Sequence, residues 1–542
     1  MTDPTPNDGE NALGTTAVLL QAKELTIRTR AGVTLLSDVS FHIEPGELVA
    51  LAGLSRTGAS ALLQSLAGAL QPASGDILID GINLYANLNA FRPWIGYVPT
   101  HFAVHPHLTV LEVLQDAARL RLPRRTSSQD RKQRLQSVLE TVDLSDVRDR
   151  RVSQLSGVEK RKLNIAVELI AYPKLLLLDE SAGPITPFDE VQIIILMREL
   201  SRQGITVILV NPRCRSIGLS DKILYLAPGG SLAWFGPAEE TLAYLKGFLP
   251  RGVVKDMFGL QEALEMLVNP QAEDGARWSQ RFREHDAYSK YVDDPLHNRY
   301  PDLLLQTRPL LRIRLRNSAK ENLSPTIVPR ASIVQKFFLL VRRNFRLFWR
   351  DGSWLAMLAG PPFVALSYLL FSLTTSPDPA GSVLVPGLLV FLVTLTAGML
   401  VQHEILKERT VYQRESRTSS LSFPYVLSKL WTVGIFAIYQ GLIWAVIHSF
   451  GQTGPGLPGG LLAFVPTGII LTLVSFVGGI LGLLVSALSR TTLTSNWVLL
   501  LSVPLLLFIL DPLSHWLRLV SISLLLTALL VFIQSRAARV QI

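Results

Sequence analysis

Gly53-Leu54-Ser55-Arg56-Thr57-Gly58-Ala59-Ser60 is the stretch from which the rest of the chain can be interpreted. An apolar run, Leu48–Ala52, precedes it and predicts a buried strand, and a helix-forming run follows at residues 61–66. A strand, a glycine loop and a helix start can cradle a phosphate, because backbone N–H groups converge on the anion and the helix dipole attracts it. A loop of the G-x-x-x-x-G-K-[ST] type carries lysine where this chain has Ala59. The sequence therefore predicts a nucleotide site without its fixed positive charge.

The composition bounds the class of protein. The chain has 542 residues, 48% of them hydrophobic, and the apolar excess lies in the last third. The net charge is +9, but no long basic run is interleaved with aromatic residues, so nucleic acid is not an expected partner. Positive charge beside apolar spans suits a protein that faces an anionic cytoplasmic leaflet. The single cysteine, Cys214, excludes a disulfide within the chain and fits a reducing compartment.

Short apolar strands alternate with helical stretches over residues 21–249, which is the pattern of an α/β domain. Residues 155–159 lead into a helix expected over residues 160–170. An apolar strand at residues 174–180 ends in two carboxylates, and another buried strand is expected at residues 205–211.

In their order and spacing, the glycine loop, residues 155–159 and residues 175–180 resemble the motifs of an ABC transporter nucleotide-binding domain. Two further runs, residues 168–170 and 234–237, are similar to the White-type (G) subfamily. The resemblance implies an α/β nucleotide-binding domain with a P-loop NTPase fold, followed by an all-α six-helix transmembrane domain. The expected layout is a disordered tail without a cleavable signal, a nucleotide-binding domain, a charged linker, an amphipathic connecting helix and a transmembrane domain, at residues 1–20, 21–249, 250–330, 331–352 and 353–542.

The resemblance also implies roles for single residues and identifies ATP and Mg²⁺ as cofactors. Asp179 and Ser60 would hold Mg²⁺, and Glu180 would orient or activate the attacking water as the catalytic residue. The signature motif would contact a nucleotide held by the opposite subunit, so the chain would work as a homo- or heterodimer of half-transporters. The residues implied at the chain's own nucleotide are Gly53, Ser55, Arg56, Gly58, Ala59, Ser60, Thr100 and Asn211, and the signature residues are Leu155, Ser156, Gly157, Val158 and Glu159.

The departures from the family pattern point to a degenerate site. Alanine replaces the loop lysine, Thr100 replaces a glutamine, Thr186 an aspartate, Asn211 or Pro212 a histidine, and Val158 the second signature glycine. A charged contact to phosphate contributes about 1.5–3 kcal/mol, and a charge at a phosphoryl-transfer transition state changes the rate about 10³–10⁵-fold. ATPase activity at this site should therefore be impaired.

Three alternatives stay open for residues of this site. Arg56 could swing its guanidinium to the phosphates, or it could be an exposed loop arginine. Asp179 and Glu180 could serve Mg²⁺ and water, or could keep only structural contacts. Ser60 could touch Mg²⁺ or cap the following helix.

Residues 331–352 join the charged linker to the apolar part of the chain. Within them, Ile333–Arg350 sets aromatic and aliphatic residues against Lys336 and four arginines, which predicts a helix at the membrane surface or, alternatively, a partly buried soluble helix. Six apolar stretches follow, each near the length of a membrane span, at residues 354–373, 384–402, 426–450, 461–488, 496–510 and 516–533. The basic loops between them place both termini in the cytoplasm of a multi-pass protein of the plasma (inner) membrane.

Residues 404–415 resemble the family's cytoplasmic coupling segment, which would dock near Thr100. The coupling residues would be Glu404, Lys407, Glu408 and Arg409, and the alternative is a solvated charged loop. Few charges lie inside the spans, which suits a lipid-like or hydrophobic substrate that crosses the lipid bilayer.

Two classes of function follow from the sequence. In the first, the chain is the degenerate half of an ATP-driven exporter, and a partner with an intact lysine loop supplies hydrolysis. In the second, it is a pseudo-ATPase that acts as a membrane scaffold or regulatory subunit. The first signature residues, Ser156 and Gly157, favour the exporter, whereas Val158 and Thr186 favour the scaffold.

Overall fold

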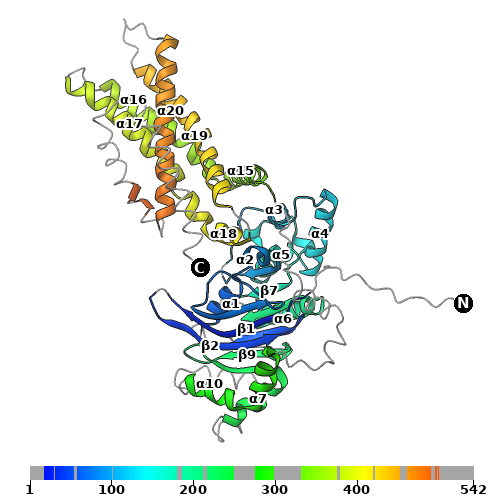
Figure 1. Ribbon diagram of the computed structural model, residues 1–542. Coiled ribbons are helices and arrows are strands. Elements are labelled where there is room, and N and C mark those ends of the chain that lie inside the picture. The colour runs from blue at the N-terminus through cyan, green and yellow to red at the C-terminus, as the bar shows by residue number, and fades with distance from the viewer. Residues whose placement is uncertain are drawn as a thin grey trace, which may run out of the picture. The chain divides into compact units, whose positions relative to one another are not determined.

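The chain folds as two units, which meet in the sequence at Arg330 and Ala331 (Figure 1). The computed structural model describes residues 17–29, 31–53, 58–100, 102–179, 186–210, 216–248, 275–297, 331–374, 379–418, 421–451, 460–489, 495–496 and 498–499.

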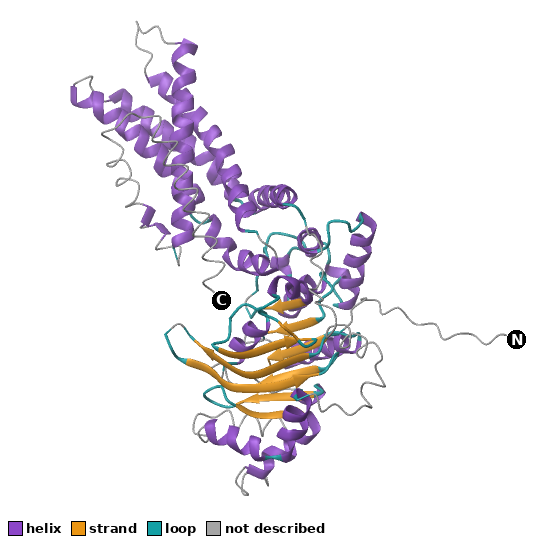
Figure 2. Ribbon diagram, in the orientation of Figure 1, coloured by secondary structure: helices purple, strands orange, loops and turns teal. Residues whose placement is uncertain are grey.

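A six-stranded sheet forms the centre of the first unit, with the strand order β10-β9-β3-β8-β7-β6 (Figure 2). Strands β6 to β9 and β3 run parallel, and β10 joins the edge antiparallel to β9. The strands β3, β7 and β8 are buried along their whole length, as expected for parallel strands covered on both faces. The bounds are β3 Leu48–Ala52, β6 Ile95–Val98, β7 Leu175–Leu178, β8 Thr206–Val210, β9 Lys222–Leu226 and β10 Leu232–Pro237.

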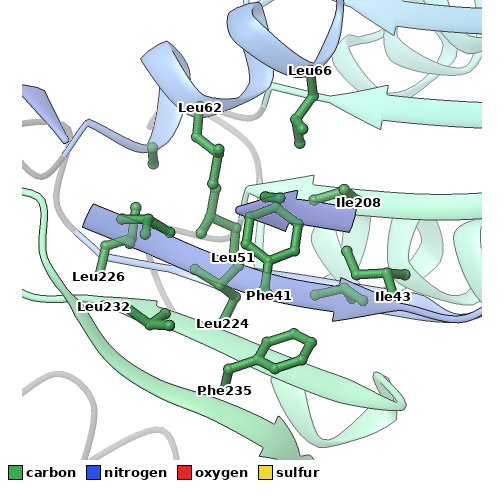
Figure 3. Packing of buried hydrophobic residues seen from close by; sticks show 14 of the residues in the cluster. Phe41, Ile43, Leu51, Leu62, Leu66, Ile208, Leu224, Leu226, Leu232 and Phe235 are labelled. Atoms are coloured by element: carbon green, nitrogen blue, oxygen red, sulfur yellow. The ribbon is translucent and has the colours of Figure 1, made fainter. Parts of the chain in front are cut away.

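A four-stranded antiparallel sheet packs beside it in the order β2-β1-β4-β5. Its strand β2 contributes Phe41, whose ring centroid lies 6.0 Å from that of Phe235 of β10. Figure 3 shows Phe41 among Leu51, Leu62 and Leu224, so one apolar core joins both sheets and helix α1. The bounds are β1 Leu20–Arg28, β2 Thr34–Ile43, β4 Ser74–Ile79 and β5 Ile82–Asn83.

Helices complete the first unit. The charged segment after β6 was expected to be helical and forms α3 and α4, which begin with the capping boxes Thr109–Glu112 and Ser127–Asp130. The expected helix at residues 160–170 begins three residues earlier, because Ser156 caps it. The bounds are α1 Ala59–Leu66, α2 Leu88–Phe91, α3 Val110–Arg121, α4 Ser128–Thr141, α5 Gly157–Leu169, α6 Pro187–Arg202 and α7 Ala238–Phe248.

Four short helical segments follow inside the stretch expected to be a linker, and they pack on the core. Trp278, Phe282 and Val292 are buried in the same apolar cluster as Phe41. The Trp234 ring of β10 stacks on Tyr244 with centroids 4.3 Å apart and lies 5.5 Å from Phe282. The segments are α10 Gly275–Glu284, α11 Asp286–Tyr288, the π-helical turn Ser289–Asp293 and α12 Asp294–Leu296.

All regular elements among the described residues of the second unit are helices. Three helices, Leu388–Arg417, Ser422–Ser449 and Phe464–Leu488, are long and apolar enough to cross a membrane, and Met357–Ser372 is a shorter apolar helix. Four expected spans therefore coincide with helices, whereas most of residues 496–533 lies outside the described residues. The bounds are α15 Ile333–Arg350, α16 Ser353–Thr374, α17 Pro379–Val401, α18 Glu404–Thr418, α19 Ser422–Gly451 and α20 Gly460–Leu488.

Glycines let α17 and α20 approach backbone to backbone. A Cβ on Gly482 would lie 2.4 Å from the carbonyl oxygen of Gly398, and a Cβ on Gly478 would lie 2.5 Å from that of Thr394. In lipid, the hydrophobic effect does not drive helices together. Small residues allow close van der Waals packing, which stabilises such a contact instead.

Candidate nucleotide site

The predicted strand, glycine loop and helix are present at residues 48–66. Strand β3 ends at Ala52, Gly58 adopts a left-handed backbone with φ 88°, and α1 begins at Ala59. A Cβ on Gly58 would lie 2.3 Å from the carbonyl oxygen of Leu35, so only glycine fits. Two residues predicted to contact the nucleotide, Ser55 and Arg56, lie outside the described residues.

The described residues of the loop carry no charge. Ala59 occupies the position of the usual lysine, at the first residue of α1, and its side chain is buried. Gly58 is the N-cap of α1, so Ser60 is not its cap, and the capping alternative for this hydroxyl is wrong. Among these residues, only the backbone N–H groups at the N-terminus of α1 can attract a phosphate.

Ser60 instead contacts the carboxylate predicted to hold Mg²⁺. The Ser60 hydroxyl donates to Oδ1 of Asp179 at 3.0 Å, and the Tyr97 hydroxyl donates to Oδ2 at 3.0 Å. Asp179 directly follows β7 and is buried. Hard oxygen donors of this kind suit Mg²⁺, so the pair Ser60 and Asp179 fits that ion. Tyr97 was missed by sequence reasoning, although the parallel pairing of β6 with β7 brings both strand ends to one edge.

The other predicted residues at this edge are placed only in part. Thr100 follows β6 and is half-buried. Thr186, where the family has aspartate, is the N-cap of α6 and accepts a hydrogen bond from the Asp189 N–H at 3.2 Å. Glu180 and Asn211 lie outside the described residues.

The signature residues form the start of helix α5. Ser156 is its N-cap: Ser156 Oγ accepts from the Glu159 N–H at 3.3 Å, and the Glu159 carboxylate accepts from the Ser156 N–H at 2.7 Å. Leu155 is buried, whereas Ser156 and Gly157 are exposed. Val158 was expected to crowd a loop, but it lies half-buried in the first helical turn, because the capping box starts the helix before it.

Two buried arginines hold the opposite end of α5, and sequence reasoning missed both. Arg121 of α3 donates to both carboxylate oxygens of Glu168, at 2.5 and 3.0 Å, and to the Val167 carbonyl at 3.1 Å. Arg134 of α4 donates to the Leu169 carbonyl. Burial lowers the pKa of Arg134 to about 10. Cations at a helix C-terminus complement its dipole, so these contacts fix α5 and the signature at its start.

The segment expected to couple the two domains is the helix α18, so the alternative of a solvated loop is wrong. Its predicted residues Glu404 and Glu408 lie 3.1 and 3.0 Å from the ammonium of Lys429, which is 3% exposed. Lys407 pairs with Asp351 at 3.0 Å. Arg409 is half-buried. Three of the four predicted coupling residues therefore pair with residues of the membrane unit.

Comparisons with known proteins match both units. The ABC transporter family matches residues 36–183, and the ABC-2 type transporter family matches residues 335–528. The chain is 29% identical over 458 residues to the ABC transporter ATP-binding/permease protein Rv1747 of Mycobacterium tuberculosis, covering 82% of this chain and 48% of that protein.

Other relatives match over a smaller part. Identity is 34% over 227 residues with the broad substrate specificity ATP-binding cassette transporter ABCG2 of Rattus norvegicus, covering 40% of this chain and 34% of that protein. The chain thus spans half or less of the length of these relatives. A solved structure, cbiO1 from Clostridium perfringens, part of the ABC transporter complex cbiONQ, is 23% identical with a TM-score of 0.39 and covers 44% of this chain and 98% of its own.

An ABC nucleotide-binding domain implies ATP binding, and an ABC-2 type domain with three helices of spanning length among its described residues identifies a membrane protein. The order of the two domains, nucleotide-binding first, is that of a White-type half-transporter. The chain therefore belongs to the ABC transporters and combines a nucleotide-binding domain with an ABC-2 type membrane domain.

Proposed function

We propose that this chain is the degenerate half of an ABC exporter, and that its dimer partner is a half-transporter with an intact lysine loop. Its own nucleotide site binds ATP weakly and hydrolyses it poorly, and the partner's nucleotide is completed by the signature residues of this chain. The observation that carries the proposal is the buried Ala59 at the start of α1, where the cation of the site should stand.

Electrostatics supports impaired binding at this site. The triphosphate is strongly anionic, and the loss of one charged contact weakens binding by about 1.5–3 kcal/mol, or roughly 10–150-fold. The loss of a cation at the transition state slows phosphoryl transfer by about 10³–10⁵-fold. Ser60 and Asp179 keep the oxygen donors for Mg²⁺, but a metal bridge to the phosphates does not replace the missing cation.

The N-terminus of α5, which carries the signature residues, supports the proposal that this chain contributes to the partner's nucleotide site. Ser156 and Gly157 are exposed at the N-terminus of α5, and nothing lies within 4 Å of a Cβ built on Gly157. This end of the helix is open to a phosphate group from another chain. The clamp of Arg121 on Glu168 keeps the helix in place for that contact.

The composition of the membrane unit supports the proposal that the substrate is a hydrophobic or lipid-like molecule. Leucine, valine, phenylalanine and glycine dominate its helices, and few charges lie inside them. The basic residues between the second and third spans and after the sixth support a topology with both termini in the cytoplasm and an assignment to the plasma (inner) membrane.

The second candidate, a non-hydrolysing scaffold or regulatory subunit, is favoured by two residues. Val158 replaces a signature glycine in the first turn of α5, and Thr186 uses its side chain to cap α6 where an aspartate would contact the other subunit. A scaffold of this kind would keep the nucleotide-binding domain only as a docking surface.

Nucleotide binding and hydrolysis by the full chain in lipid vesicles test the proposal. The variants are Ala59→Lys and, as a matched control of similar length without charge, Ala59→Met. We expect Ala59→Lys to tighten Mg-ATP binding by roughly 10–150-fold, and Ala59→Met to bind no better than the wild type.

Co-reconstitution with a homologue that has a complete lysine loop separates the two functions. The exporter predicts ATP hydrolysis by the pair that falls when Ser156→Ala is introduced in this chain. The scaffold predicts that Ser156→Ala changes nothing. Rapid hydrolysis by the wild-type chain alone would contradict both.

A further inference from the structure

Helix α15 has the reverse of the usual amphipathic arrangement. Lys336, Arg343 and Asn344 are buried, with Arg343 only 2% exposed. On the opposite side, Phe338 is 64% and Trp349 59% exposed. The helix therefore turns its charged face toward its own unit and its apolar face outward. An exposed apolar face of this extent indicates a binding surface, because water does not favour it.

Two side chains of the charged face of α15 contact neighbouring helices. Arg343 pairs with Glu415 of α18 at 2.5 Å, and the Asn344 amide donates to Ser428 of α19 at 3.4 Å. These contacts fix the rotation of α15 about its axis. If α15 rotated so that its apolar face became buried, the Arg343 guanidinium and the Glu415 carboxylate would be separated. Unpaired charges are costly when the groups are buried.

The apolar face of α15 continues the outer surface of the spanning helices. Its rings reach those of α19, with centroids 6.2 Å apart for Phe337 and Trp431 and 4.9 Å apart for Phe348 and Phe436. From Trp431, the exposed stripe runs along α19, which is long and apolar enough to cross a membrane. It consists of Trp431, Ile435, Ile438, Leu442 and Val446. Helix α15 lies crosswise at one end of these long helices (Figure 1). The same surroundings therefore cover the exposed stripe of α19 and the outward face of α15.

Arg342 stands on this outward face. It follows Phe338 by one helical turn and precedes Trp349 by two, so the three side chains lie along one side of the helix. Arg342 is exposed and makes no ion pair with any described residue. An arginine between two exposed aromatic rings suits the boundary between headgroups and acyl chains, where its stem stays apolar and its guanidinium reaches phosphate.

The segments that carry and adjoin this face have a net positive charge, although Lys336 and Arg343 lie on the buried side of α15. Residues 333–351 and 404–429, which include α15, α18 and the start of α19, contain ten lysines and arginines but four acidic residues. This surplus attracts anionic lipid more than zwitterionic lipid. A planar guanidinium also matches the geometry of a phosphate.

We propose that the outward face of α15 is a binding surface for anionic phospholipid, with the Arg342 guanidinium on the lipid phosphate and Phe338 and Trp349 among the first acyl carbons. The occupied leaflet is the one on the side of α18. The surface requires only the membrane unit and does not depend on whether the chain hydrolyses ATP.

Spin labels on the full chain test what covers the face. The only cysteine is first replaced, Cys214→Ala, and a label is attached at Phe338→Cys or, as an aqueous control, at the exposed Gln129→Cys of the nucleotide-binding unit. In vesicles of phosphatidylcholine and phosphatidylglycerol, oxygen should collide with the label at 338 more often than a water-soluble nickel chelate does. The reverse is expected at 129. A label at 338 that favours the nickel chelate, or that neither reagent reaches because protein covers it, would overturn the proposal.

Photoactivatable phosphatidylglycerol and phosphatidylcholine test the chemistry of the site. Crosslinks to the peptide of residues 333–350 should form mainly with phosphatidylglycerol. Arg342→Gln should lower that yield about fivefold, as expected for the loss of one cation near the lipid surface, whereas Arg342→Lys should retain most of it. The exposed Arg125→Gln is the matched control and should change nothing. Equal yields from both lipids, or an unchanged yield in Arg342→Gln, would overturn the assignment.

Discussion

Tyr97 and Asp179 are joined at the ends of neighbouring parallel strands, where the Tyr97 hydroxyl donates to Oδ2 of the carboxylate at 3.0 Å. Both side chains are buried. Tyr97→Phe should therefore lower the free energy of unfolding of the nucleotide-binding unit by about 1.5–3 kcal/mol, because a charged acceptor loses its donor. Urea unfolding of the full chain, followed by pulse proteolysis, measures the change. Tyr172→Phe, at an exposed ring, is the control and should cost less than 0.5 kcal/mol, roughly the limit for surface changes. An unchanged midpoint for Tyr97→Phe would show that the contact adds no stability.

The buried pair of Arg121 and Glu168 gives a second prediction. Arg121→Met leaves a carboxylate buried without its cation, which should destabilise the nucleotide-binding unit by about 3–5 kcal/mol. Adding Glu168→Leu should recover most of this loss, since the unpaired charge is then gone. The exposed pair of Arg148 and Asp149 is the matched control, and Arg148→Met should cost less than about 1 kcal/mol. If the double variant were as unstable as Arg121→Met, the cost would lie in packing and not in the unpaired charge.

His42 makes stability depend on pH. Burial, with a smaller effect from Lys222, lowers the pKa of His42 from 6.5 to about 3, and its Nδ1 contacts the Gln21 amide at 3.3 Å. Between these two pH values, His42 is protonated in the unfolded chain and neutral in the folded chain. The contribution of His42 is therefore fully present above pH 6.5 and is lost by about 1.4 kcal/mol per unit as the pH falls toward 3.

His42→Asn, which keeps an acceptor near the position of Nδ1, isolates this effect. Its free energy of unfolding should fall less steeply than that of the wild type between pH 6 and 4, roughly the window set by the two pKa values. Equal slopes for the two proteins in urea titrations would show that the imidazole is protonated in the folded state.

The glycine contact between α17 and α20 predicts sensitivity to a single methyl group. Gly482→Ala places a Cβ 2.4 Å from the Gly398 carbonyl oxygen, so the two helices must separate, at a cost of about 1–3 kcal/mol. Gly468→Ala is the control on the same helix, because its Cβ would lie 3.6 Å from that of Ala445, an ordinary contact. The melting temperature of the full chain in detergent compares them, and a smaller loss for Gly482→Ala than for Gly468→Ala would refute the close approach.

Ser486 of α20 caps the start of α18, since its hydroxyl accepts from the Ile405 and Leu406 N–H groups at 3.2 and 3.1 Å. Ser486→Ala should speed hydrogen exchange at these two amides about fivefold, on the basis of roughly 1 kcal/mol for a lost cap. The buried Ser489 is the control, because its hydroxyl has no partner among the described residues, and Ser489→Ala should leave both amides unchanged. Equal exchange in Ser486→Ala and the wild type would mean that other groups satisfy the helix start.

Local patterns predicted much of this molecule. The apolar run before Gly53 and the helix formers after it gave β3 and α1, and the amphipathic segment has the bounds predicted for it, Ile333–Arg350. These predictions hold because strand and helix periodicity depend on near neighbours. The helix start at Ser156 was also readable, as a serine followed three residues later by a glutamate.

Contacts between distant residues could not be predicted in this way. The pairs of Tyr97 with Asp179 and of Arg121 with Glu168 are separated by 82 and 47 residues. The packing of residues 275–297 on the core was missed, because its helices are too short for a clear period. An amphipathic pattern likewise does not say whether protein or lipid lies on the apolar side, and in α15 the apolar side faces away from the helix's own unit.

Gly58 has a consequence for how such a protein can change over time. Its lack of a side chain is required by the Leu35 carbonyl oxygen 2.3 Å from the Cβ position, whether or not a phosphate is ever present. The next position, which is lysine in the family pattern and Ala59 in this chain, is not constrained by the fold in this way. A nucleotide-binding domain can therefore lose its chemistry by single substitutions while the architecture around the loop persists, which lets an inactive subunit remain foldable and available to an active one.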